Sequence, residues 1–526
     1  MKFSYSLKKK IVLVGFLSCT LAFSASVCGA GEPATIRLSL ADSIRMALAT
    51  DESIESSDAQ RDAAWHNLRS ARRSKGPVVS WNSQAYRIGG RNYESANESH
   101  DEYGDPHAGS VRPLYVTDSG QLTAGSPVSV GSYAYRNTFA NSWNLTVPLY
   151  TGGQVEGQID EGRYRLNRAD LTTENTRQSV RYAAAEGYAN LIHLENLAKV
   201  AREAVAMGNT QLNLIQAQFE EGAVAEADLL MMKVNIANDR QNLVNAEKQV
   251  EVAKSTLASL VGLPQDTDVE PVDIFSYEPY DKDLADCEAY ALEHRPDGLA
   301  ADYNIKAAQA QKDTAKAGYR PKVSAVAGQS IVGNSPFRSE RSHAWEAGLN
   351  ISWNIFDNGV TAENVRQADA NIRAYEAEAR RVKKNIRLET RTAYLNMKAA
   401  EQNIQETALA VKQAEDSYLI AQVRYEEGVD VLLGLTDAQD KLTRAKQNYM
   451  TALYQYNLSR AALEKAMGVP VGIDALRYVA AEKTGATAEQ ALQASQMEKE
   501  PDEYEDNGKW TQADRPLGKV GGKGYP

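Results

Sequence analysis

The feature that most constrains the fold is a long helix-forming run that keeps a strict seven-residue hydrophobic repeat. From Gly359 to Gly428 no residue breaks a helix, and at ~1.5 Å per residue this helix would be about 100 Å long. That is too long for a compact domain. Apolar or small residues then recur at steps of three and four, at Leu435, Ala438, Leu442, Ala445, Tyr449, Ala452, Tyr456, Ser459, Leu463 and Ala466. This period predicts left-handed coiled coils.

The chain carries this pattern twice. "FEEGAVAEADLL" (219–230) and "YEEGVDVLLGLT" (425–436) lie 206 residues apart, as do "PLYTGG" and "NIFDNG", and "VGLP" and "MGVP". Upstream the offset is 244, so the first copy carries an insertion of 244 − 206 = 38 residues. We therefore predict two tandem repeats, 38–264 and 284–470, joined by a polar linker, 265–283. Each repeat reads helix, strand, strand, long helix, turn, helix.

The ends of the chain differ from the repeats. Residues 1–30 combine four lysines, an apolar run too short to span a bilayer and a small-residue ending, which predicts a secretory signal peptide. Lipid attachment at Cys19 or Cys28 is the weaker alternative. Cleavage after Ala30 would leave Cys287 as the single cysteine, which excludes an internal disulfide. The tail, 471–526, is rich in Glu, Lys and Gly near its end, so we expect it to be partly disordered.

Four strands are expected, and the last one alternates most clearly. Every second residue from Trp345 to Ile355 is apolar, and polar or small residues lie between them. Eleven residues is the length of a tilted strand that crosses an outer membrane, and tryptophans near both ends suit its interfaces. The strands are expected at 78–88, 137–149, 322–332 and 343–356, with a long insertion loop at 89–136. The residues expected to face lipid are Trp345, Leu349, Ile351, Trp353, Trp143 and Leu145.

A soluble sandwich would give the same alternation, but the signal peptide and the long coiled coils favour a membrane. No segment after the signal peptide has the ~18 consecutive apolar residues of a membrane helix, so a membrane would be crossed by strands. Open sheet edges are forbidden in lipid, and four strands cannot close a barrel. Several copies must then share one barrel. Two copies give eight strands and three give twelve, and the sequence does not choose.

Over residues 38–470 the chain resembles the TolC family of outer-membrane efflux and type I secretion channels. The resemblance rests on the doubled unit, the strand-to-helix turns and the two hairpin tips, 219–230 and 425–437. It implies a mainly α fold with a membrane β-barrel: a homotrimer whose 12-strand barrel lies in outer-membrane lipid and continues as a 12-helix coiled-coil α-barrel across the periplasm. It also implies a periplasmic adaptor protein at the tips and an inner-membrane transporter that supplies energy.

The resemblance also implies which residues close the periplasmic mouth. Asp437 matches a family acid at the narrowest point, while Gly434 replaces a second acid. Asp430 replaces a basic residue, and Asp228 matches the carboxylate that pairs with that residue, so we expect the two aspartates to repel each other unless a cation lies between them. Tyr425 matches a tyrosine that ties neighbouring coils together. The adaptor would dock on the tips, at Gly222, Ala223, Val224, Gly428 and Val429.

Other functions find little support in the sequence. The insertion contains "NESHDEYGDPH", which could bind a metal, although a solvated loop explains such residues better. We find no phosphate-binding loop, nucleophile elbow or metalloprotease motif, so we expect no enzyme, no cofactor and no metal. A pI near 5.3 argues against nucleic acid. The alternative function is a periplasmic adaptor or a structural coiled-coil protein. The cargo, small molecules or a secreted protein, stays open.

Overall fold

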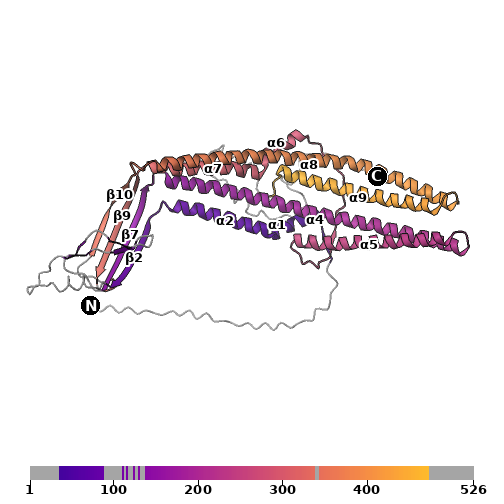
Figure 1. Ribbon diagram of the computed structural model, residues 1–526, viewed down its shortest axis with the longest axis horizontal. Helices are drawn as coiled ribbons and strands as arrows, with labels where there is room; N and C mark the ends of the chain where they lie inside the picture. Colours follow the sequence, from indigo (N-terminus) through magenta and orange to yellow (C-terminus); the bar gives the residue numbers. More distant parts are fainter. Residues whose placement is uncertain are drawn as a thin grey trace, which may run out of the picture.

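The protein is elongated, with a β-sheet at one end and two helical hairpins that turn at the other (Figure 1). The computed structural model describes residues 35–87, 109–111, 114–116, 122–124, 128–130, 137–333, 335–337 and 343–472. The predicted signal peptide, the metal-binding alternative at 97–107 and the tail beyond Gly472 lie outside these residues. Within them, no helix combines the length and the apolar character that a membrane-spanning helix needs.

The helices and strands repeat in the same order. The first set is α1 (Leu40–Thr50), α2 (Glu52–Arg73), β2 (Val78–Arg87), β7 (Asn137–Tyr150), α4 (Gln154–Glu220) and α5 (Glu226–Leu260). The second set is α6 (Leu284–His294), α7 (Pro296–Lys316), β9 (Lys322–Gly333), β10 (His343–Ser352), α8 (Val360–Glu426) and α9 (Leu432–Met467), with a short 3-10 turn, η1 (Ala317–Tyr319), before β9.

The predicted tandem repeat is confirmed down to the ends of individual helices. Helices α4 and α8 both have 67 residues and begin 360 − 154 = 206 residues apart. Helices α1 and α6 both have 11 residues and begin 284 − 40 = 244 residues apart. The uninterrupted helix expected between Gly359 and Gly428 is α8. Both long helices start at a glycine in the left-handed region, Gly153 (φ 94°) and Gly359 (φ 85°), a conformation that costs other residues energy.

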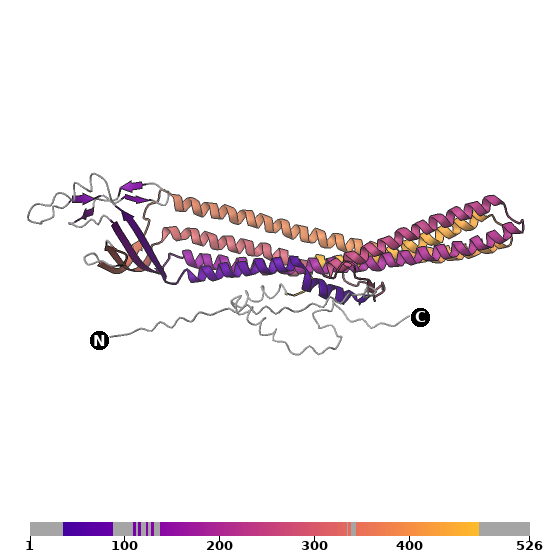
Figure 2. The same cartoon turned by 90° about the horizontal axis from the view of Figure 1, so that it is seen from below.

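The helices form one curved layer, in which the long helices α4 and α8 run its whole length (Figure 2). Near the sheet the contacts run in the order α2, α4, α7, α8. Near the tips the order is α5, α4, α9, α8. Helices α2 and α5 therefore lie at one edge of the layer, and α8 lies at the other edge.

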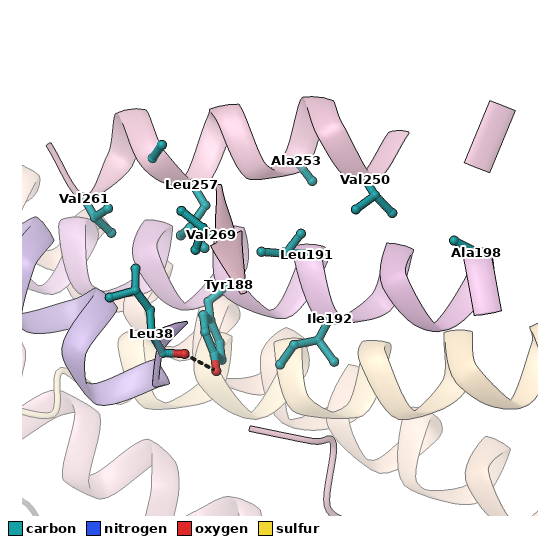
Figure 3. Close-up of a cluster of buried hydrophobic side chains, with 11 residues drawn as sticks. Leu38, Tyr188, Leu191, Ile192, Ala198, Val250, Ala253, Leu257, Val261 and Val269 are labelled. Carbon is teal, nitrogen blue, oxygen red and sulfur yellow. Dashed lines mark hydrogen bonds between the residues drawn. The ribbon is translucent and has the colours of Figure 1, made fainter. Parts of the chain in front are cut away.

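A hydrophobic cluster fixes the middle of the layer (Figure 3). Leu191 and Leu257 are fully buried there between α4 and α5. The Tyr188 hydroxyl donates to the Leu38 carbonyl at 3.1 Å, and burial of the ring raises the pKa of Tyr188 to about 12. The second repeat copies this bond, because the Tyr394 hydroxyl donates to the Lys282 carbonyl at 3.2 Å.

The linker at 265–283 differs from the polar connection that the sequence predicts. Strand β8 (Val269–Pro271) pairs in parallel with β1 (Ile36–Leu38), and residues 272–283, which we call the strap, lie against the second hairpin. The Tyr277 hydroxyl donates to Glu401 on α8 at 2.9 Å, and Lys398 on α8 donates to the strap carbonyl of Tyr280 at 3.0 Å. Tyrosine side chains, counted as polar in the sequence, give the strap its contacts.

The insertion between β2 and β7 contains short ladders instead of loop alone. Strand β3 (Gly109–Val111) pairs with β6 (Val128–Val130), and β4 (Leu114–Val116) pairs with β5 (Leu122–Ala124), both antiparallel. Each strand has three residues, which is too short to show an alternating pattern in the sequence.

Candidate channel wall, gate and docking tips

The sheet has the order β10-β9-β7-β2, and all its strands are antiparallel. Strands of the two repeats are thus joined, because β7 pairs with β9. Residues directly opposite one another share a face of a sheet. One row across it therefore carries Trp345, Gln329, Trp143 and Trp81 on a single face. The Trp81 and Trp143 rings stack with their centroids 5.7 Å apart.

The next row on this face carries Ala347, Ala327, Leu145 and Val79. Leu349 and Ile351 continue it and are 67% and 66% exposed. The residues predicted to face lipid on β10 and β7 therefore form one continuous apolar surface. The opposite face is polar, since Asn144 and Glu346 flank Gly328, and a Cβ there would lie 3.0 Å from the Asn144 Oδ1.

Strand β10 is shorter than the expected 343–356, because it ends at Ser352. Trp353, expected on the strand, follows its end, and its indole Nε1 donates to the Tyr319 carbonyl at 3.1 Å. The alternation continues in the sequence beyond Ser352, but a strand needs a hydrogen-bonded partner. Strand β9 begins at Lys322, opposite Ser352, so the ladder stops there.

Sequence analysis missed the contribution of β2 and β9 to the apolar face. Their alternation is weak, because Gln329 lies on that face near its outer end. The register supplies a partner for this amide, since Gln329 Nε2 lies 2.6 Å from the His343 ring Nε2. Trp81 could have been found from its place in an expected strand.

Both hairpin tips end their long helix in the same way. Gly222 (φ 77°) and Gly428 (φ 70°) adopt left-handed conformations. The Gly222 amide donates to the Phe219 carbonyl, and the Ala223 amide donates to that of Gln218. Gly428 and Val429 repeat these bonds with Tyr425 and Arg424. This pair of bonds is the Schellman motif, which glycine permits because it lacks a Cβ.

Most of the residues expected to dock an adaptor are open at these tips. No atom lies within 4 Å of a Cβ built on Gly222 or Gly428, Ala223 is exposed, and Val429 is 69% exposed. Val224 differs, because it is half-buried and packs on a cluster of Ile215, Leu229, Met232, Ile236 and Leu432. Its side chain therefore belongs to the interior of the tip more than to its outer surface.

Three of the predicted gate residues belong to one neighbourhood between the hairpins. The Tyr425 hydroxyl on α8 donates to Gln218 Oε1 on α4 at 3.1 Å, so Tyr425 does link neighbouring coils. Burial raises the pKa of Tyr425, and the negative charge of Asp228 raises it further. Gln218 was not among the predicted residues, and it precedes the "FEEG" motif without any signal of its own.

Asp430 has a partner that sequence analysis missed. Its Oδ2 lies 3.7 Å from Nε of Arg424, on the same hairpin, so the expected repulsion from Asp228 is offset within the chain. The carboxylate also accepts from the Val431 amide at 2.8 Å. A Cβ at Gly434 would lie 3.0 Å from Asp430 Oδ1. The two departures from the family pattern are thus linked, because glycine at 434 leaves room for the aspartate at 430.

Asp437 lies in the second turn of α9, with its side chain 59% exposed. Its Oδ2 lies 2.6 Å from Lys441 Nζ, one turn further along the helix. Exposed pairs of this spacing contribute only about 0.3–0.5 kcal/mol, so the lysine leaves the carboxylate accessible to cations. In the part of the chain that the structure describes, no three metal-binding side chains gather.

The described geometry agrees with one family of proteins. The family model for outer membrane efflux proteins matches residues 43–263 and 289–469, one segment in each repeat. The chain belongs to the outer membrane efflux protein family. The predicted TolC-type fold, outer-membrane location and role as an efflux channel with a periplasmic helical part are confirmed. The family is one of transport channels and matches neither the adaptor nor the structural coiled-coil alternative.

Individual relatives of this efflux protein are distant. It is 24% identical to the pyoverdine export outer membrane protein OpmQ of Pseudomonas aeruginosa over 68% of this chain and 77% of the relative. It is 26% identical to the toluene efflux pump outer membrane protein TtgF of Pseudomonas putida, over 51% of this chain and 56% of that protein. The crystal structure of the outer membrane protein VceC from Vibrio cholerae superposes with a TM-score of 0.66 at 19% identity, covering 82% and 96% of the two chains.

Proposed function

We propose that three copies of this chain form one export channel. The observation that carries the proposal is that the sheet is open at both edges: among the described residues, β2 and β10 each pair on one side only. If β2 of one copy pairs with β10 of the next, three copies give a closed barrel of twelve strands. The face with Trp143, Trp345 and Leu349 then contacts lipid, and the face with Asn144 and Glu346 lines the lumen.

The helical layer is open at its edges in the same way. On α8, Leu388, Leu395, Leu409 and Val423 keep seven-residue spacing and are 64%, 54%, 52% and 50% exposed. At the other edge, α5 exposes Leu230, Val234, Val244 and Val252. A seven-residue apolar stripe is stable in water only against another helix, so each edge requires a neighbour. The edge of one copy would cover the opposite edge of the next, and the ring would close.

The purified protein in detergent is expected to be a homotrimer. Four strands per chain cannot close, so a smaller particle would leave unpaired backbone groups in the membrane region. Native mass spectrometry or light scattering of the solubilised particle measures this. Dissociation to single chains under mild detergent would contradict the shared barrel.

The channel would act with partners, as the printed names of its relatives indicate for efflux pumps. A periplasmic adaptor would dock on Gly222, Ala223, Gly428 and Val429, and an inner-membrane transporter would supply the energy. The chain itself would be a passive conduit, with neither enzymatic activity nor a cofactor. Relatives named for pyoverdine export and toluene efflux favour small molecules over secreted proteins as cargo.

The gate would lie where three second-repeat hairpins meet. In a trimer, three copies of Asp437 and three of Asp430 would approach a common axis. Like charges held together attract cations, and a ring of acids can set selectivity. Tyr425 with Gln218 would hold each second hairpin against the first, so opening would require this bond to break.

Planar-bilayer currents through the wild-type channel should show cation preference and block by divalent or trivalent cations added on the periplasmic side. In the variant Asp430→Ala/Asp437→Ala we expect the block to weaken by about tenfold in concentration, since roughly 1.4 kcal/mol is tenfold in binding. Arg424→Ala should strengthen the block, because it frees Asp430 from its partner. Unchanged block in both variants would show that the constriction lies elsewhere along the coils.

A further inference from the structure

Helix α8 carries a stripe of basic residues for which the structure gives no partner. Arg373, Arg380 and Arg387 follow one another at seven residues, and Lys384 lies between two of them. All four are exposed, and no hydrogen bond or ion pair joins them to the described residues. The chain as a whole has a net charge of −11, so an unpaired basic stripe calls for a specific acidic partner.

Acidic residues lie on α2 at the opposite edge of the layer. Glu55 and Asp62 are seven residues apart and exposed, and Asp51 precedes the first turn of the helix. In the described chain Glu55 has no ion-pair partner, and Asp62 meets only its sequence neighbour Arg61, at 3.5 Å. The two edge helices thus carry opposite charge.

Both charged stripes lie on the same side of the helical layer. The basic stripe continues along α8 at seven-residue steps to Lys398 and Glu401, which hold the strap. On α2, Asp58 lies between Glu55 and Asp62 and pairs with Arg177 of α4. Arg177 lies against Gly472, just beyond Val469, which packs with the strap's Tyr280 in one cluster. The strap side is therefore common to both.

The repeat also sets the height at which the two edges would meet. Within one chain α4 packs against α7, with Gln311 donating to Glu161 at 2.7 Å and Arg168 donating to Asn304 at 3.2 Å. Helices α8 and α2 are the equivalents of α4 and α7 in the other repeat. Adding 206 to the α4 residues and subtracting 244 from the α7 residues places Gln367 opposite Asn67, and Ala374 opposite Gln60.

This register aligns the charges. Because the helices are antiparallel, a step toward the tip on α8 is matched by a step toward the N-terminus on α2. Arg373 then comes level with Asp62, Arg380 with Glu55, and Lys384 with Asp51, each within one residue or ~1.5 Å along the axis. Three bases meet three acids on one flank of the seam, which is how flanking charges select partners in coiled coils.

We propose that these three ion pairs join α8 of one copy to α2 of the next and fix the register of the ring. The inference rests on the proposed trimer and names the residues that select its neighbours. A second copy is the occupant that fits, since it brings the acids at the same height and on the same side.

Charge exchange tests the proposal. Arg380→Glu and Glu55→Arg should each lower the temperature at which the purified trimer dissociates on heating in SDS, by roughly 5 °C. The double variant Glu55→Arg/Arg380→Glu should regain the wild-type value, because its charges are again opposite. Lys199→Glu, on the central helix α4, reverses an exposed charge away from the edge and should change nothing.

Co-expression sharpens the test. Wild-type and doubly exchanged chains with different tags should form mixed trimers about threefold or more below the random proportion, because mixed seams place like charges together. Random mixing, or failure of the double variant to recover, would overturn the ion pairs while leaving the trimer intact. A wild-type protein that is no trimer would instead overturn the proposed function.

Discussion

Leu349→Arg or Ile351→Arg is expected to abolish assembly in the outer membrane. Both side chains lie on the apolar face of β10, more than half exposed in the single chain, with Ala325 and Val323 beside them on β9. An arginine near the middle of the bilayer costs about 2–4 kcal/mol on the lipid face of a barrel. A trimer carries the change three times, which is comparable to the whole stability of a typical domain.

Asn350→Arg is the matched control, because it lies between the two positions on the same strand and points to the opposite face. Its register partner is Ser324, and the lumen-side neighbours are polar. The variant should reach the membrane at the wild-type level and change the single-channel conductance instead. Heat-modifiable migration in outer-membrane fractions measures assembly. Equal tolerance of arginine at 349, 350 and 351 would contradict the assignment of the two faces.

Ala223→Glu is expected to abolish export while leaving trimers in the membrane. Ala223 is exposed at the tip, and its amide already closes the helix by donating to the Gln218 carbonyl. The substitution leaves that backbone bond intact and adds a charge, which a docked adaptor would have to desolvate. An unpaired charge buried in an interface costs several kcal/mol, so we expect export to fall at least about tenfold.

Two further variants separate docking from folding. Gly222→Ala adds only a methyl group in open space, but it strains the left-handed backbone at φ 77° by about 1 kcal/mol. It should lower stability slightly and keep export. Ala408→Glu adds the same charge on an exposed position of α8 far from the tip and should also keep export. Cellular efflux of a fluorescent dye and the amount of trimer are measured together. Normal export from Ala223→Glu trimers would remove the docking role.

The seven-residue period and the two offsets determined the helices, because both are local. A helix is fixed by contacts at three and four residues, so α8 could be read from Gly359 to Gly428 without any tertiary information. The glycines at 222 and 428 announced the tips for the same reason. The repeat gave the element order, and the motifs matched those of one channel family.

The tertiary structure alone decided what depends on contacts distant in sequence. Strand β10 ends at Ser352 because β9 supplies no partner beyond Lys322, although the alternation continues to Ile355. Val224 turns inward because Leu432 of the other repeat lies beside it. Asp430 meets Arg424 instead of opposing Asp228, and the linker becomes a strap because Glu401 and Lys398 hold it. Each outcome depends on which chain segment lies opposite, and one-dimensional periodicity carries no record of that neighbour.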